Sequence, residues 1–172
     1  MLKRLLLLSV LLTSVFVACS TPDKSDEITK KPSLVQHPEW SKNANIYEVN
    51  IRQYSEEGTF EAFRKDLPRL KEMGVKILWL MPIHPIGVIN RKETEESRGS
   101  YYSVADYKDV NPNFGTKEDF KRLVDDAHEM GFKLIIDWVA NHTAWDNPWT
   151  ENKDWYELNE DGNFTPPHGT DW

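Results

Sequence analysis

The stretches Met73-Gly74-Val75-Lys76-Ile77-Leu78-Trp79-Leu80 and Met130-Gly131-Phe132-Lys133-Leu134-Ile135-Ile136 decide the fold of this chain. In each stretch a glycine separates the end of a helical pattern from a short apolar run. Glycine is a common residue directly after a helix, and a short apolar run behind such a stop is typical of a buried strand. The two stretches therefore predict two transitions from helix to strand, with strands over 75–80 and 132–136.

A helical pattern precedes each glycine. Before Gly74, apolar residues recur at steps of three and four behind Thr59 as candidate cap, although Pro68 interrupts the helix. These residues are Phe60, Phe63, Leu67, Leu70 and Met73. Before Gly131 the same spacing follows Thr116 as cap, with Asp119 three residues later. Its apolar residues are Phe120, Leu123, Val124, Ala127 and Met130. A β-rich run over 45–51 precedes both helices and predicts a further strand.

The order of these elements places the chain in the α/β class. Strands that alternate with helices are expected to be parallel and joined by right-handed crossovers. Two architectures remain, a doubly wound sheet and a (β/α)₈ barrel. The sequence has neither a GxGxxG nor a Walker motif to favour the doubly wound sheet. Long segments instead follow the last two strands, and in a barrel such loops build the active-site face.

The amino terminus resembles a bacterial lipoprotein signal. Lys3 and Arg4 precede an apolar run over 5–18, which is shorter than the about 20 residues of a membrane-spanning helix. Phe16-Val17-Ala18-Cys19 resembles a lipobox, so we expect a signal peptide over 1–18 and lipidation of Cys19. An ordinary signal peptide with an incidental cysteine is the alternative. The polar residues 19–39 predict a flexible tether, and the protein is expected at the bacterial cell envelope, on its surface or periplasmic side.

Composition excludes some classes of partner. The chain of 172 residues is 39% apolar and 28% charged, as in soluble globular proteins. Its net charge of −7 provides no basic field for nucleic acid or anionic lipid. We therefore expect no nucleic-acid partner, and membrane contact only through the lipid anchor.

Four stretches between Ile46 and His142 resemble the start of the catalytic barrel in the alpha-amylase family, glycoside hydrolase family 13. They read IYEVNIRQYS from Ile46, ILWLMPIHPIG from Ile77, SYYSVADYKDVNPNFGTKEDF from Ser100 and LIIDWVANH from Leu134. With the lipobox, they are most similar to lipoprotein amylases of Bacteroides-type bacteria. The resemblance implies the amino-terminal portion of a (β/α)₈ TIM barrel, incomplete, with about three strands and two helices. Residues 40–142 would be its first three β/α units and 143–172 the start of a domain inserted after the third strand.

The resemblance also implies roles for residues at the strand ends. The residue that corresponds to Tyr102 stacks under the sugar in the family, and Asp106 would support its loop. Tyr101 is the alternative for this stacking position. Asp137 would hold the site together, and His142 would donate a hydrogen bond to the sugar at the cleavage subsite. These assignments agree with chemistry, because aromatic faces suit pyranose rings and an imidazole N–H suits sugar hydroxyls.

Calcium is the one cofactor that the resemblance implies, at one site that includes Asn141. An amide oxygen is a hard ligand of the kind that Ca²⁺ prefers. The sequence contains no HExxH motif, and its aspartates after His142 lack the spacing of an EF-hand loop. We therefore expect no other metal.

By resemblance, the expected function is retaining hydrolysis of α-1,4-glucosidic bonds in starch-like glucans. Such hydrolysis needs two carboxyl groups, which the family carries on later strands, so none of the catalytic residues is expected before Trp172. A typical barrel has about 250 residues, more than the 172 residues of this chain. We therefore expect this chain alone to be inactive. The alternative is a non-catalytic glucan-binding lipoprotein or a truncated pseudoenzyme. Four tryptophans suit either glucan stacking or packing: Trp145, Trp149, Trp155 and Trp172.

Overall fold

The computed structural model describes residues 35–91 and 98–166. The predicted signal peptide, Cys19, Trp172 and most of the predicted tether lie outside the described residues. All the described helices and strands belong to the unit Glu39–Trp172. Within 35–91 and 98–166, no helix has the length and apolar character needed to cross a bilayer.

Three parallel strands form the sheet, as the sequence predicts. They are β1 (Ile46–Val49), β2 (Ile77–Leu80) and β3 (Lys133–Ile136), in the spatial order β1-β2-β3. Val49 pairs with Leu80, and Leu80 with Ile136, so the carboxyl ends of the strands lie at one edge. A doubly wound sheet reverses its strand order at a switch point, whereas a barrel adds each strand beside the last. The observed order β1-β2-β3 fits a barrel wall, in which each strand lies beside the one before it.

The helices differ in number from the prediction. They are α1 (Ile51–Tyr54), α2 (Phe60–Lys65), α3 (Leu67–Glu72) and α4 (Lys117–Glu129). Ile51, predicted as the last strand residue, begins the single turn of α1 instead. The helix predicted over 60–73 is two helices, because Pro68 lies in the first turn of α3, where its missing N–H costs no hydrogen bond. The helix predicted over 60–73 thus divides next to Pro68, while α4 has the predicted position.

Local capping fixes where these helices begin and end. The Thr59 hydroxyl accepts a hydrogen bond from the Ala62 amide, 3.2 Å away. Thr116 and Asp119 form a reciprocal capping box: the Thr116 Oγ1 accepts from the Asp119 amide, and the Asp119 carboxylate accepts from the Thr116 amide. Gly74 and Gly131 have φ of 82° and 86°, which suits glycine after a helix. The predicted caps and stops are confirmed.

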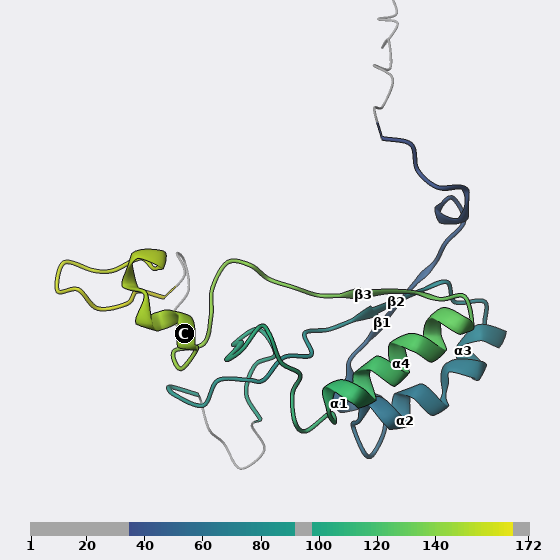
Figure 1. The fold of residues 1–172 in the computed structure, drawn as a ribbon, viewed down its shortest axis with the longest axis horizontal. Helices are drawn as coiled ribbons and strands as arrows, with labels where there is room; N and C mark the ends of the chain where they lie inside the picture. Colours follow the sequence, from purple (N-terminus) through teal and green to yellow (C-terminus); the bar gives the residue numbers. More distant parts are fainter. Residues whose placement is uncertain (1–34, 92–97, 167–172) are drawn as a thin grey trace, which may run out of the picture. The chain divides into compact units, whose positions relative to one another are not determined.

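The helices cover one face of the sheet (Figure 1). The core between them is apolar and fully buried. Its members include Phe60, Phe63, Leu67, Leu70, Leu78, Leu80 and Leu123. On the other face Trp79 pairs with Ile135, and 36% and 45% of their surfaces are exposed. This one-sided packing is that of a barrel wall, whose helices all lie outside.

Two long loops follow the strands and pack against each other. The loop after β2 is closed on itself by a bridge between Ile86 and Val104. The loop after β3 contains η2 (Pro148–Glu151) and η3 (Lys153–Trp155), while η1 (Glu39–Ser41) precedes the sheet. The carbonyl of Val104 accepts hydrogen bonds from the Ala144 amide and the Asn147 side chain. The loops therefore form one structure at the carboxyl end of the sheet.

Candidate functional site

The carboxylate of Asp137 lies where β3 ends. The Asp137 amide donates to the Leu80 carbonyl, 2.8 Å away, which continues the ladder one residue past the strand. The hydroxyl of Tyr102 donates to the Asp137 Oδ2 at 2.9 Å. Burial raises the pKa of Tyr102, and the hydrogen bond to Asp137 and the nearby negative charges raise it further. The phenol therefore keeps its proton at neutral pH and remains a donor to Asp137.

The two neighbouring tyrosines of this loop occupy different environments. Tyr101 donates to the Asn50 Oδ1 and accepts from the Arg52 Nε, both at 2.7 Å. The Arg52 guanidinium also lies 4.0 Å from the centre of the Tyr101 ring. Tyr101 therefore fastens its loop to the end of β1, while Tyr102 turns toward Asp137. The stacking role of Tyr102 stays a prediction.

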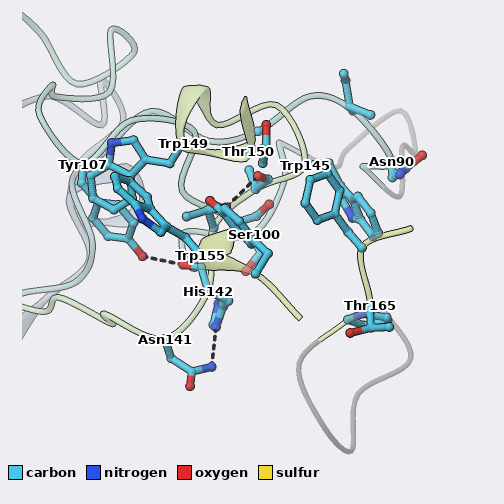
Figure 2. Close-up of a pocket in the computed structure, with 18 of the residues that line it drawn as sticks. Asn90, Ser100, Tyr107, Asn141, His142, Trp145, Trp149, Thr150, Trp155 and Thr165 are labelled. Carbon is cyan, nitrogen blue, oxygen red and sulfur yellow. Dashed lines mark hydrogen bonds between the residues drawn. The ribbon is translucent and has the colours of Figure 1, made fainter. Parts of the chain in front are cut away.

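His142 is connected to Tyr102 through its ring. Its Nε2 lies 3.0 Å from the Tyr102 carbonyl oxygen. Because a carbonyl only accepts, Nε2 carries the proton. The Nδ1 then accepts from the Asn141 side-chain amide at 3.3 Å (Figure 2). For His142 to donate the predicted hydrogen bond to a sugar, its Nε2–H must either break its bond to the Tyr102 carbonyl or be shared between that carbonyl and the sugar.

Asn141 offers a single oxygen toward a calcium ion. The side chain is exposed, and its amide nitrogen is directed at His142, which leaves Oδ1 as the ligand atom. Calcium takes about 6–8 oxygen ligands. In the described part of the chain, no group of three or more His, Cys, Asp or Glu side chains is arranged to hold a metal. Asn141 would supply one of these oxygen ligands, and the calcium ion at this position stays a prediction.

Asp106 and Tyr107 shape the same loop. The Asp106 Oδ1 accepts from the Lys108 amide at 2.8 Å, which forms a tight turn around Tyr107. The Tyr107 hydroxyl is 2.6 Å from the Val139 carbonyl and 2.8 Å from the His142 carbonyl, and it donates to both. Burial raises the pKa of Tyr107. This residue holds the segment after β3, and sequence reasoning missed it because its partners lie more than thirty residues away in the chain.

A pocket of about 1100 Å³ lies between the two loops (Figure 2). Asn141 and His142 are on its wall, whereas Tyr102, Asp106 and Asp137 are not among its lining residues. The predicted site residues thus separate into a hydrogen-bonded set at the strand ends and a pocket beside it. His142 belongs to both.

A family model described as "Alpha amylase, catalytic domain" matches residues 25–169. The chain belongs to the alpha-amylase family, glycoside hydrolase family 13.

Relatives in the alpha-amylase family differ in activity. The chain is 32% identical over 169 residues to Alpha-amylase SusG of Bacteroides thetaiotaomicron, covering 86% of this chain and 23% of that protein. It is 38% identical over 132 residues to a trehalose synthase of Thermus thermophilus, covering 69% and 13%. The chain thus spans less than a quarter of each of these two relatives.

A solved alpha-amylase has the same arrangement of strands and helices. The crystal structure from Lactobacillus plantarum matches with a TM-score of 0.70 and 47% identity, over 74% of this chain and 30% of that one. The three-stranded sheet is therefore part of a TIM barrel, as the sequence predicts.

The tryptophans of this member of the alpha-amylase family divide into packed and exposed side chains. Trp149 stacks on Tyr107 with an interplanar angle of 22° and ring centres 5.4 Å apart. Trp145 meets Phe164 edge to face at 6.4 Å. Trp155 touches the edge of Trp149, yet 66% of its surface is exposed. Packing therefore explains Trp149, but not Trp155.

Proposed function

We propose that the protein is a retaining glycoside hydrolase that cleaves α-1,4-glucosidic bonds of starch-like glucans. The observation that carries this proposal is the set of hydrogen bonds that joins Tyr102, Asp137 and His142 at the carboxyl ends of the strands. In TIM-barrel enzymes the active site lies at this face. Membership in the alpha-amylase family supports glucan as the substrate class.

In this mechanism the chain binds and orients one sugar. The ring of Tyr102 serves as the platform for a pyranose, and its hydroxyl stays fixed on Asp137. The Nε2–H of His142 turns from the Tyr102 carbonyl to a sugar hydroxyl, where a fixed donor stabilises the distorted ring of the transition state. Asp137 acts as a positioning residue. We propose that the nucleophile and the general acid, which a retaining mechanism places about 5–5.5 Å apart, come from further strands of the barrel.

We also propose that the protein is a lipoprotein of the cell envelope, anchored through Cys19. The lipobox-like sequence that ends at Cys19 supports this location. An acyl chain contributes about 0.8 kcal/mol for each CH₂ that it buries. A multiply acylated cysteine therefore suffices to hold an acidic protein at a membrane that its charge would repel.

The second candidate is a glucan-binding lipoprotein without catalysis. Binding would then use the same tyrosine and histidine.

The test is hydrolysis of maltoheptaose by the full-length protein, with the anomeric form of the first product followed by NMR. The expected result is cleavage with retention of the α configuration, and a strong loss of turnover in Tyr102→Ala. Product with inverted configuration would contradict the retaining mechanism. Binding of maltoheptaose without any cleavage would favour the second candidate.

A further inference from the structure

One turn of the loop after β2 carries Tyr102. The turn is closed by a hydrogen bond from the Ser103 amide to the Ser100 carbonyl, 3.1 Å away. The Tyr102 hydroxyl donates to Asp137, and the Tyr102 carbonyl oxygen lies 3.0 Å from the Nε2 of His142. Both of these partners follow β3 in the chain. They therefore fasten the turn to the end of that strand.

A second anchor joins the same turn to the segment that follows β1. The Tyr101 hydroxyl donates to the Asn50 Oδ1 and accepts from the Arg52 Nε, so it is engaged both as donor and as acceptor. Arg52 also donates through Nη1 and Nη2 to the Gly99 carbonyl, 3.3 Å from each nitrogen. Its guanidinium lies 4.0 Å from the centre of the Tyr101 ring, within the range of a cation–π contact. One guanidinium thus holds the loop both before the turn and within it.

The anchor on β1 is itself well fixed. Arg52 lies in α1, directly after Ile51, which is 2% exposed and belongs to the core. The Met81 amide donates to the Val49 carbonyl at 2.9 Å, which extends the pairing of β1 and β2 past the last strand residue. The contacts between Arg52 and Tyr101 are part-buried, and hydrogen bonds from a charged donor are among the stronger ones in proteins. The turn is therefore tied to a rigid part of the barrel wall.

The positions of Tyr101 and Tyr102 depend on each other. A planar and stiff peptide bond joins them, so a shift of one residue displaces the other by a similar amount. Release of Tyr101 from Arg52 would therefore move the Tyr102 ring relative to Asp137. A displacement of about 1 Å at a site that orients substrate can lower a rate by about 100-fold.

We propose that Arg52 and Tyr101 are positioning residues of the sugar subsite, which act through Tyr102 by fixing its ring relative to Asp137. The effect on turnover rests on the proposed function, whereas the placing of Tyr102 is measurable without it. Tyr101 is then the anchor of the subsite and not its platform. Its hydroxyl is engaged on both sides, and the Arg52 guanidinium lies over its ring.

The first test is a double-mutant cycle on maltoheptaose hydrolysis by the full-length protein. Tyr101→Phe removes the hydroxyl and keeps the ring that Arg52 covers. We expect kcat/KM to fall about tenfold in the wild-type background, but less than about twofold when Tyr101→Phe is added to Tyr102→Ala. Residues that act through a shared partner are not additive, whereas a general loss of structure would lower both backgrounds equally. Equal losses in the two backgrounds would overturn the proposal.

Tyr54→Phe is the matched control for loss of a bonded hydroxyl. The Tyr54 hydroxyl also accepts from an arginine, the Nη2 of Arg69 at 2.9 Å, and it donates to the Asp66 carboxylate. Its ring packs edge to face on Phe63 in the helical layer. The control should lower the Tm and leave kcat/KM unchanged. A loss of kcat/KM equal to that of Tyr101→Phe would show that lowered stability explains the effect, and would overturn the positioning role.

The second test follows Tyr102 without measuring activity. The full-length protein is labelled with ¹³C at tyrosine Cζ, and Tyr102→Phe identifies the Tyr102 signal in the NMR spectrum. We expect this signal to move towards that of a solvent-exposed tyrosine in Tyr101→Phe. It should also move in Arg52→Lys, because lysine keeps the charge but lacks the planar fork of donors. An unchanged signal in either variant would refute the role of that residue. A displaced signal, in a protein whose wild type does not hydrolyse maltoheptaose, would support the anchor and refute the proposed hydrolase.

Discussion

Replacing Tyr107 with phenylalanine tests whether this residue fixes the segment that carries Asn141 and His142. The substitution removes one hydroxyl and keeps the ring that stacks on Trp149. The hydroxyl is the group that bonds the carbonyls of Val139 and His142. Without it, no part of the Tyr107 side chain can hydrogen-bond the backbone of this segment.

The expected cost follows from that hydrogen bond. The hydroxyl has a single proton, which the two carbonyl oxygens share. The free energy of unfolding should therefore fall by about the contribution of one part-buried hydrogen bond, together with the cost of leaving its acceptors without a partner. Leaving such a group without a partner costs about 1–3 kcal/mol. For a domain of this size, 1 kcal/mol lowers the Tm by roughly 2–4 °C. The destabilisation should be concentrated in the segment over 138–142.

The assay combines thermal unfolding with amide hydrogen exchange. Tyr107→Phe should lower the Tm and speed exchange over 138–142, whereas α4 should exchange as in wild type. Tyr47→Phe is the matched control, because Tyr47 also packs on the core and its hydroxyl makes no hydrogen bond within the described residues. Wild-type Tm and wild-type exchange over 138–142 in Tyr107→Phe would refute the reasoning.

Four further predictions concern the caps, the site and the anchor. Thr116→Ala removes the capping hydroxyl of α4 and should cost about 1 kcal/mol in urea unfolding; an unchanged midpoint would contradict this. Hydrogen bonds from Thr116 hold the pKa of the Asp119 carboxyl below its usual range. The Asp119 carboxylate therefore contributes its full stabilisation above the unfolded pKa of about 3.9, and this stabilisation is lost as the pH falls through the lower folded pKa. Asp119→Asn should therefore make the free energy of unfolding depend less on pH on the acid side. His142→Ala should lower kcat and kcat/KM together by about 10- to 1000-fold in the full-length enzyme, as expected for loss of one fixed donor; near wild-type kcat would remove His142 from the site. Cys19→Ser should release the protein from membrane pellets, and continued sedimentation with the membranes would argue against lipidation.

The sheet and helix ends could be predicted because their signals are local. Thr116 with Asp119, and each glycine that follows a helix, act within a few residues of where they stand in the chain. The break between α2 and α3 shows the limit of this approach. Apolar spacing continues across Pro68, and the periodic pattern alone does not reveal that the chain ends one helix and starts another at Asp66.

Only those site residues whose position is set by the end of a strand could be predicted from the sequence. Asp137 lies at the end of β3 in any parallel sheet with this register, so sequence position alone places it at the carboxyl edge. The partners of Tyr102 and Tyr107 depend instead on how two loops pack across more than thirty residues. Loops have no period from which such contacts can be read.

Long-range packing also explains why the sequence leaves two roles, glucan stacking and packing, open to these tryptophans. Trp149 and Trp155 are close in the chain, yet one is stacked on a ring from the other loop and the second faces solvent. The difference arises at Tyr107, whose hydroxyl is bonded to the segment after β3 and whose ring stacks with Trp149. Trp155 meets Trp149 with the two ring planes at 82°. The part-buried Tyr107 thus determines which of the two tryptophans is stacked between the loops.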